Sequence, residues 1–325
     1  MIFEIANWQL LVHFQSMKKV EFIRLTTLFA TAFILTSIQA REWTSSAGKT
    51  LDADYVSSEG GNVTLKRKAD GQTFTVPLNR FSDADQVWVK EQMAKPAVPK
   101  PLEGPFADKI TGDWVAAEFD GLPYMIYGAA ELDGSKKYPL LLALHGKSSN
   151  NENGKQVGRW MKTFADADNY AKNPCIIVAP LCYQPFGATG GGWDDEPGEK
   201  MLKLMPDLIE GLPVDENRVY IFGYSMGGFG TTYLASQEPK MFAAAIAVAG
   251  CSMSSASAFK RKPLWLFHAT DDNVVSVDGS RALAEELKRS KDFKFTEFES
   301  GGHGIVGQVF NDPAVHTWLF SQAQK

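Results

Sequence analysis

The chain has 325 residues, enough for one large domain and a small accessory one. Hydrophobic residues make up 44% of it and charged residues 22%, which is the balance of an ordinary globular protein. The net charge of −5 argues against a nucleic-acid-binding protein, because such proteins carry a basic surface stripe. The sequence contains no C-x-x-C, H-E-x-x-H or G-x-x-x-x-G-K-[ST] motif, so we expect neither a metal nor a cofactor.

The first forty residues have the pattern of an export signal. A basic cluster at residues 18–24 precedes a mostly apolar run at residues 28–38, and Ala40 suits signal-peptidase cleavage. The run is shorter than the roughly 20 residues that span a bilayer, so we expect no stable membrane span. We predict a signal peptide over residues 1–40 and a secreted or periplasmic protein. Met17 is an alternative start, and a buried N-terminal helix is the alternative structure.

Residues 41–94 have the pattern of a small β-rich domain, in which short strand-like runs alternate with glycine-containing turns. A helix is predicted to begin near Ser82 and to include Trp88 and Met93. Prolines are dense between residues 95 and 109, which predicts a semi-rigid linker and a domain boundary. The predicted strands are residues 42–44, 54–57, 62–66 and 73–76.

This segment resembles the Sla-one homology domain, a small β-barrel domain of endocytic adaptors. The resemblance implies a binding role, with a peptide or a cell-surface ligand as the partner, and it does not identify that ligand. The segments that carry the resemblance are residues 41–44 (Arg-Glu-Trp-Thr), 63–66 (Val-Thr-Leu-Lys), 75–78 (Thr-Val-Pro-Leu) and 81–82 (Phe-Ser).

Residues 110–325 alternate between strand and helix patterns. The predicted strands are continuous apolar runs, which indicates burial on both faces of a sheet. We therefore predict an α/β domain with a doubly wound, mostly parallel sheet, whose site lies at the carboxyl ends of the strands. The strands are predicted at residues 140–144, 175–179, 219–222, 243–248, 264–267 and 293–298, and helices at 199–209, 227–237, 280–289 and 313–320.

A G-x-S-x-G motif spans residues 223–227, between a predicted strand and a predicted helix. In this context the motif forms a tight turn that exposes a nucleophilic serine, here Ser225, above the N-terminus of the helix. The glycines allow the strand and the helix to approach each other closely. The sequence therefore predicts nucleophilic catalysis by Ser225.

His303 is the predicted base for this serine. It lies in a glycine-rich loop after the strand at residues 293–298, and it follows the serine, as the chain order Ser, acid, His requires. The other four histidines are assigned other positions. His13 lies in the leader, and His145 lies in a loop before the serine. His268 is interpreted as a packed residue at a strand end, and His316 lies in the last helix.

The acid is expected after the strand at residues 264–267, where Asp271 and Asp272 are adjacent. One of them would hold the second N–H of the imidazole and fix its tautomer. The other would cap a turn. We prefer Asp272, although spacing alone leaves both residues open.

Two backbone N–H groups are expected to stabilise the oxyanion. The first belongs to Met226, which follows the nucleophile. The second is assigned to Lys147, with Gly146 allowing the turn after the strand at residues 140–144. The alternative for His145 and Gly146 is an ordinary turn that ends this strand.

Residues 110–325 resemble the α/β-hydrolase superfamily, and within it the predicted-peptidase, dienelactone-hydrolase and phospholipase/carboxylesterase cluster, which includes secreted bacterial esterases. In that pattern the acid is the aspartate of D-x-V-V, which favours Asp272. Lys147 departs from the pattern, which has a small residue there, and it changes the charge of the pocket. The matching segments are residues 138–146, 178–180, 223–228, 272–275, 302–304, 312–313 and 318–320.

Two residues are assigned to substrate binding, Trp193 and His145. Trp193 follows a glycine-rich loop and precedes two aspartates, so it is interpreted either as a platform for a sugar ring or as a surface aromatic packed on its own loop. The resemblance implies acetyl or feruloyl esters of polysaccharides as substrates. The sequence has no long apolar lid insertion, which disfavours a lipase.

The three cysteines leave two interpretations open. Export would allow one disulfide among them, with the pairing undetermined. Alternatively, all three are small buried apolar residues. They are Cys175, Cys182 and Cys251.

The leading hypothesis is a secreted serine carboxylic-ester hydrolase that forms an acyl-enzyme. Ser225 would attack the ester, His303 would transfer the proton, and Asp272 would orient the imidazole. A serine peptidase of the same fold is the first alternative. The second is a non-catalytic binding protein whose function depends on the N-terminal domain.

Overall fold

The computed structural model describes residues 40–94, 99–147, 152–187 and 190–324. The predicted signal peptide falls, apart from Ala40, outside the described residues, as do residues 95–98 of the predicted linker. The chain divides into two compact units, Met1–Ala97 (unit 1) and Val98–Lys325 (unit 2). Among the described residues no helix is long and apolar enough to cross a membrane.

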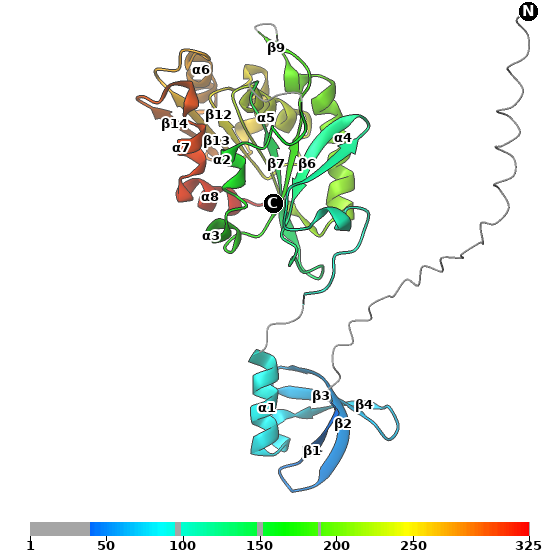
Figure 1. Ribbon diagram of the computed structural model, residues 1–325. Helices are drawn as coiled ribbons and strands as arrows, with labels where there is room; N and C mark the ends of the chain where they lie inside the picture. The colour runs from blue at the N-terminus through cyan, green and yellow to red at the C-terminus, as the bar shows by residue number, and fades with distance from the viewer. Residues whose placement is uncertain (1–39, 95–98, 148–151, 188–189, 325) are drawn as a thin grey trace, which may run out of the picture. The chain divides into compact units, whose positions relative to one another are not determined.

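Unit 1 is a four-stranded antiparallel sheet with one helix (Figure 1). Alternate residues of the strands point inward, and with the helix they form a core that contains Trp43, Leu65 and Val89. The strands lie where the sequence predicts them, in the order β1-β2-β3-β4. The elements are β1 (Ala40–Thr44), β2 (Thr50–Glu59), β3 (Asn62–Arg67), β4 (Thr73–Pro77) and α1 (Asp83–Ala94).

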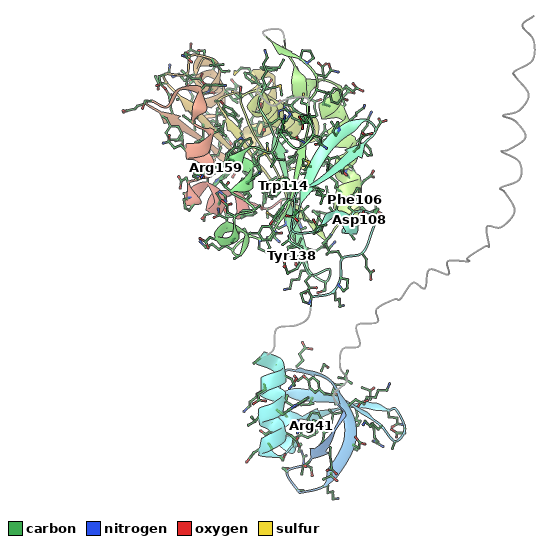
Figure 2. All side chains as sticks on the ribbon, viewed as in Figure 1. Arg41, Phe106, Asp108, Trp114, Tyr138 and Arg159 are labelled. Carbon is green, nitrogen blue, oxygen red and sulfur yellow. The ribbon has the colours of Figure 1, made fainter. Side chains whose placement is uncertain are left out.

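A buried carboxylate ties the first strand of unit 1 to its helix. Asp85 forms an ion pair with Arg41, a residue labelled in Figure 2. Asp85 also accepts hydrogen bonds from the Thr44 N–H at 2.7 Å and from the Ser82 hydroxyl at 2.9 Å. The Arg41 guanidinium lies 4.5 Å from the ring centre of Trp88, so the cation also contacts an aromatic face.

Unit 2 contains an eight-stranded sheet in the order β14-β13-β12-β11-β7-β8-β6-β5. Its strands are parallel except at one edge, where β5 and β6 run antiparallel to their neighbours. The predicted doubly wound, mostly parallel sheet is therefore confirmed, whereas the antiparallel edge pair was not predicted. The strands are β5 (Val115–Phe119), β6 (Leu122–Tyr127), β7 (Tyr138–Leu144), β8 (Ile176–Pro180), β11 (Val214–Tyr224), β12 (Ala244–Val248), β13 (Leu264–Ala269) and β14 (Phe293–Phe298).

Helices cover both faces of this sheet, as continuous apolar strands require (Figure 1). In β7, Leu140, Leu142 and Leu144 pack on one side and Leu141 and Ala143 on the other. Helices α4, α5 and α6 contribute to the first core, and α2, α7 and α8 to the second. The helices are α2 (Arg159–Lys162), α3 (Ala167–Tyr170), α4 (Glu196–Gly211), α5 (Met226–Gln237), α6 (Asp278–Leu287), α7 (Val306–Phe310) and α8 (Pro313–Phe320).

Strand β7 pairs with β8 on one side and with β11 on the other. The connection after β7 leads to β8 on one side, and the connection after β11 leads to β12 on the other side. The two connections therefore diverge above the carboxyl ends of β7 and β11. Such a divergence point is where open α/β sheets form their binding crevice.

Candidate active site

The turn that carries Ser225 is held by close backbone packing on both sides. Ser225 joins β11 to α5 with φ 56° and ψ −121°, a conformation that residues with a side chain rarely adopt. A Cβ atom on Gly223 would lie 2.3 Å from the Gly227 carbonyl oxygen. A Cβ atom on Gly227 would lie 2.0 Å from the carbonyl oxygen of Leu144. Glycine is therefore required at both positions for this turn to form.

The side chains of Ser225, His303 and Asp272 form a hydrogen-bonded row. His303 Nε2 lies 2.8 Å from Ser225 Oγ, and His303 Nδ1 lies 2.8 Å from Asp272 Oδ2. The Asp272 side chain is fully buried, whereas 17% of the His303 side chain is exposed. With the ring proton on Nδ1, the imidazole donates to the carboxylate and its Nε2 can accept the hydroxyl proton of the serine.

Asp272 is held as a carboxylate by several donors. Its Oδ1 accepts hydrogen bonds from the N–H groups of Val274 at 2.9 Å and Val275 at 3.0 Å. Burial disfavours the charged form, but the hydrogen bonds from His303 and from these two N–H groups outweigh it, and the pKa of Asp272 lies below its ordinary value. The site therefore contains a negative charge next to the imidazole at neutral pH.

Asp271 has a different set of contacts. Its carboxylate accepts hydrogen bonds from the N–H groups of Gly301 at 3.3 Å and Gly302 at 2.7 Å. Both glycines have positive φ angles, 129° and 58°, in the turn that leads to His303. Of the two candidate acids, Asp272 faces the imidazole and Asp271 supports the loop that carries it.

His268 contacts this row, and sequence reasoning missed it by treating the residue only as a packed strand end. Its side chain is 1% exposed, and its Nε2 lies 3.1 Å from Asp272 Oδ2 and 3.0 Å from the Val275 carbonyl oxygen. Its Nδ1 lies 2.7 Å from Ser280 Oγ. The spacing of four residues between His268 and Asp272, across a strand end, was the only signal in the sequence that could have indicated the contact.

The two predicted oxyanion donors lie on adjacent strand ends. Met226 is the first residue of α5, so its N–H has no acceptor in a preceding helical turn. Gly146, beside Lys147, approaches the serine so closely that a Cβ atom on it would lie 3.4 Å from Ser225 Cβ. Lys147 and Met226 both line the cavity beside the serine.

His145 lies behind the wall of this cavity, which differs from the prediction that it binds substrate. Its Nδ1 lies 2.7 Å from the Gly146 carbonyl oxygen, and its Nε2 accepts the N–H of Cys182 at 2.9 Å. Both ring nitrogens are therefore occupied by backbone groups. Burial lowers the pKa of His145 to about 4, and its hydrogen bond to Gly146 opposes that effect only partly.

Trp193 is a wall of the cavity rather than an open platform. The residue is 1% exposed, and its indole N–H donates to the His145 carbonyl oxygen at 3.1 Å. A Cβ atom on Gly230 of α5 would lie 2.5 Å from Trp193 Cβ, so the glycine makes room for the tryptophan. The alternative of a surface aromatic packed on its own loop is therefore wrong, whereas substrate binding by Trp193, which lines the cavity, stays a prediction.

The cavity beside Ser225 has a volume of about 1070 Å³. Aromatic and apolar side chains form much of its lining, and the exposed Lys147 and Asp194 add one charge of each sign. A cavity of this size and character can hold a small organic molecule, with the serine at its wall. The principal apolar lining residues are Phe186, Phe229, Tyr233, Met253 and Val275.

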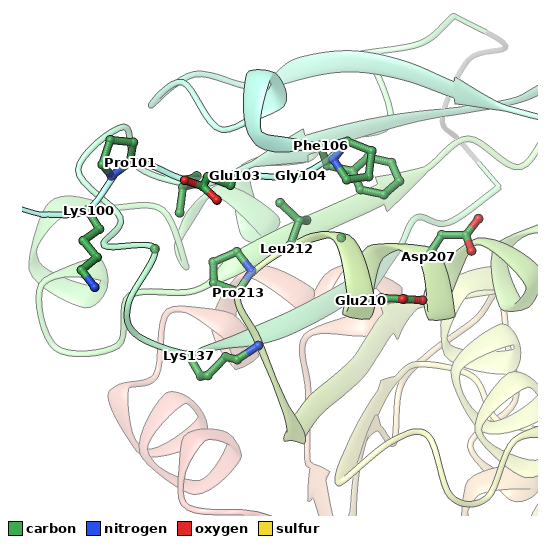
Figure 3. A pocket seen from close by; sticks show the side chains of 14 residues that line it. Lys100, Pro101, Glu103, Gly104, Phe106, Lys137, Asp207, Glu210, Leu212 and Pro213 are labelled. Carbon is green, nitrogen blue, oxygen red and sulfur yellow. The ribbon is translucent and has the colours of Figure 1, made fainter. Parts of the chain in front are cut away.

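A second cavity, of about 880 Å³, lies beside the C-terminal end of α4. Figure 3 shows Phe106, Leu212 and Pro213 around it, together with the charged side chains of Lys137 and Glu210. Its described lining residues include no serine, cysteine or histidine, so it offers no nucleophile paired with a base.

The three cysteines are buried and unpaired, as the packing interpretation expects and the disulfide interpretation does not. Burial raises the pKa of each thiol, to about 12 for Cys182 and to about 11 for Cys251. Such thiols are protonated at neutral pH and are poor nucleophiles.

Comparisons with known proteins place this geometry in a known fold. The Phospholipase/Carboxylesterase family model matches residues 199–319, a range that includes Ser225, Asp272 and His303. A thermostable esterase of known structure is 29% identical to this chain and superposes on it with a TM-score of 0.59. The match covers 65% of this chain and 64% of the esterase chain. Unit 2 therefore has the α/β-hydrolase fold.

Curated relatives match about half of this chain. The bifunctional acetylxylan esterase/xylanase XynS20E of Neocallimastix patriciarum is 28% identical over 173 residues, which cover 52% of this chain and 24% of the relative. The probable feruloyl esterase C of Aspergillus niger is 25% identical over 177 residues, which cover 52% of this chain and 62% of the relative. The matches thus span less than two thirds of the length of either relative.

Proposed function

We propose that this protein is an exported carboxylic-ester hydrolase that works through an acyl-enzyme. The observation that carries the proposal is the row of hydrogen bonds from Asp272 through His303 to Ser225, beside an open cavity. In the first step, Ser225 Oγ attacks the carbonyl carbon of the ester while His303 Nε2 accepts the hydroxyl proton. Asp272 keeps the other ring proton on Nδ1 and stabilises the imidazolium that forms.

The carbonyl oxygen becomes negative as the tetrahedral intermediate forms, and the N–H groups of Met226 and Lys147 donate to it. The intermediate collapses when its C–O bond breaks and His303 gives its proton to the departing alcohol. Water then attacks the acyl-enzyme with His303 as the base, and a second collapse releases the carboxylic acid and restores Ser225.

The proposed substrates are acetyl or feruloyl esters of polysaccharides. Two relatives are named as an acetylxylan esterase and a feruloyl esterase, which supports this class. The aromatic residues Phe186, Phe229 and Tyr233 line a cavity much larger than an acetyl group needs. Because flat aromatic groups pack well against such side chains, we expect feruloyl esters to be preferred to acetyl esters.

The test is ester hydrolysis by the purified protein and two serine variants. Ser225→Ala should reduce kcat on p-nitrophenyl acetate by roughly 10³-fold or more, because it removes the nucleophile. Ser236→Ala on the same helix, where the hydroxyl contacts the Tyr233 carbonyl oxygen and the Gln237 side chain, is the matched control and should retain activity. Undiminished hydrolysis by Ser225→Ala would refute the mechanism.

A substrate panel then separates the alternatives. Feruloylated oligosaccharide, acetylated xylan and peptide amides should be compared at equal enzyme concentration, and we expect turnover to decrease in that order. Turnover of the amides alone would replace the esterase by a serine peptidase. Absence of turnover of every ester and amide would favour a binding protein.

Export and the role of unit 1 complete the proposal. Residues 1–40 are proposed to be a cleaved signal peptide, so N-terminal sequencing of exported protein should begin near Arg41, and an intact leader would contradict this. Unit 1 is proposed to be a Sla-one-homology-like domain that binds a peptide or cell-surface ligand. Deleting residues 41–94 should leave the turnover of small esters nearly unchanged, whereas a large loss would mean that unit 1 contributes to catalysis.

A further inference from the structure

We propose that His268 is a positioning residue of this active site, which donates a hydrogen bond to Asp272 and thereby sets the orientation and basicity of the carboxylate that holds His303. The inference rests on the proposed function. It assigns a role to a buried histidine that does not take part in the acyl-transfer steps themselves.

The contacts of His268 determine which of its ring nitrogens carries a hydrogen. Its Nε2 faces two oxygen acceptors, Asp272 Oδ2 at 3.1 Å and the Val275 carbonyl at 3.0 Å. A bare ring nitrogen would be repelled by both oxygens, so Nε2 must carry a hydrogen. On the opposite side of the ring, Nδ1 lies 2.7 Å from Ser280 Oγ, which can donate its hydroxyl proton. With Ser280 donating to Nδ1, the ring hydrogen lies on Nε2, where it faces Asp272.

The Asp272 carboxylate is surrounded by as many donors as it can accept. Its Oδ1 accepts the N–H groups of Val274 and Val275, and its Oδ2 faces both His268 and His303. A carboxylate has about four lone-pair sites, so these four donors saturate it. The saturated carboxylate cannot rotate without breaking a hydrogen bond, and this fixes the direction in which Oδ2 points toward His303.

The other charged groups near His268 do not compete with Asp272 for its ring hydrogen. Across the strand pair, His268 is in register with Glu297 of β14, and that carboxylate is paired with Arg281. On the α6 side, Ser280 Oγ lies 3.7 Å from Cys251 Sγ, a thiol that burial keeps protonated. The ionised group that contacts the His268 ring directly is therefore Asp272.

Removing the His268 donor should shift the pH dependence of kcat in a defined direction. With one donor fewer, the negative charge of Asp272 is less dispersed and attracts the imidazolium form of His303 more strongly. The neutral base then appears only at higher pH, so the acidic limb of the pH profile of kcat should move upward. The freed carboxylate also loses its fixed orientation, which lowers kcat with little effect on substrate binding.

The experiment uses the full chain with four variants. His268→Leu removes the donor, whereas His268→Gln keeps an N–H near the position of Nε2. Ser280→Ala removes the partner of Nδ1 and leaves the imidazole in place. His316→Leu is the matched control, because His316 is also buried and bonded to a carbonyl oxygen, at 2.8 Å in Phe310, but lies in α8. Kinetic constants on p-nitrophenyl acetate, their pH profiles and melting temperatures are measured for each.

We expect His268→Leu to lower kcat by about 10- to 100-fold, as loss of an orienting partner does in other sites, with KM within about twofold of the parent. Its acidic limb should move to higher pH, and His268→Gln should recover most of kcat. His316→Leu should lower the melting temperature without changing kcat or the pH profile. If His268→Leu behaves like His316→Leu, the positioning role is refuted.

Ser280→Ala and Ser225→Ala decide the cases that His268→Leu alone leaves undecided. If His268→Leu does not fold, Ser280→Ala decides: a several-fold loss of kcat at constant KM supports the role, and parental kcat refutes it. Ser225→Ala in the same assay separates this inference from the proposed function. An active Ser225→Ala variant overturns both, whereas an inactive one together with a fully active His268→Leu variant overturns only the role of His268.

Discussion

The Nε2 atom of His303 lies 2.8 Å from Oγ of Ser225, although 78 residues separate the two in the chain. Parallel strands produce this proximity, because β11, β12, β13 and β14 are consecutive neighbours in the sheet and all end at the same edge. The serine follows β11, the aspartate follows β13 and the histidine follows β14. One edge of the sheet therefore collects three side chains from three separate loops.

The two adjacent aspartates should differ sharply in their effect on catalysis. Asp272→Asn keeps the shape of the side chain but presents an amide to His303, which favours the wrong tautomer, so we expect kcat to fall by roughly 10⁴-fold. Asp271→Asn affects only the hydrogen bonds to Gly301 and Gly302 and should cause a much smaller loss. Steady-state kinetics on one ester substrate compare them, and equal losses would mean that the assignment of the acid is wrong.

Gly227 should be far less tolerant of a methyl group than Gly307. A Cβ atom at Gly227 would lie 2.0 Å from the Leu144 carbonyl oxygen, whereas one at Gly307 would meet no atom within 4 Å. We expect Gly227→Ala to destabilise unit 2 by roughly 1–3 kcal/mol and to reduce ester turnover, because backbone must move to relieve the overlap. Gly307→Ala should be neutral or slightly stabilising. Thermal unfolding measures both, and similar melting temperatures would contradict the packing of this turn.

The stability of unit 2 should depend on pH through His145. Its pKa in the folded state is about 4, against 6.5 for the ordinary side chain, so the unfolded chain binds more protons between these values. The stabilisation is fully present above pH 6.5 and is lost as the pH falls toward 4, a change on the order of 3 kcal/mol. Denaturant unfolding at several pH values measures it. His145→Gln cannot titrate and should flatten the dependence in that window, and an unchanged slope would refute the assignment.

Asp85 should control the stability of unit 1 without affecting catalysis. Asp85→Ala leaves Arg41 and the Thr44 N–H without their partner. Because the Arg41 side chain is 25% exposed and water can reach it, we expect a loss of roughly 1–3 kcal/mol. The matched control is Asp70→Ala, which breaks an exposed ion pair with Arg67 and should cost less than about 1 kcal/mol. Calorimetry of the full chain measures the unfolding of each unit, and loss of ester turnover in Asp85→Ala would contradict the expected independence.

Much of the fold was predictable because buried parallel strands leave a strong signal. Residues 140–144 and 243–248 are uninterrupted apolar runs, and both are strands covered on two faces. The edge strand β5 and its neighbour β6 were missed. Strand β5 alternates exposed and half-buried residues and so lacks a continuous apolar run, whereas β6 is mostly buried.

Only the site residues that follow from chain order or from a local motif could be predicted. The G-x-S-x-G turn and the glycine-rich loop identify Ser225 and His303 as candidates, because both motifs are local in sequence. Contacts that depend on how loops fold over the sheet were not accessible. The burial of Trp193 against Gly230 and the hydrogen bond from His268 to Asp272 belong to that class.

The proposed nucleophile, Ser225, has a left-handed backbone conformation that is unfavourable for a residue with a side chain. A glycine there would adopt φ 56° without steric conflict, so Ser225→Gly should be more stable than the parent by about 1 kcal/mol while lacking the nucleophile. A library selected for heat resistance alone would therefore enrich inactive proteins at this position. A search for thermostable variants of this protein has to measure ester turnover and melting temperature together.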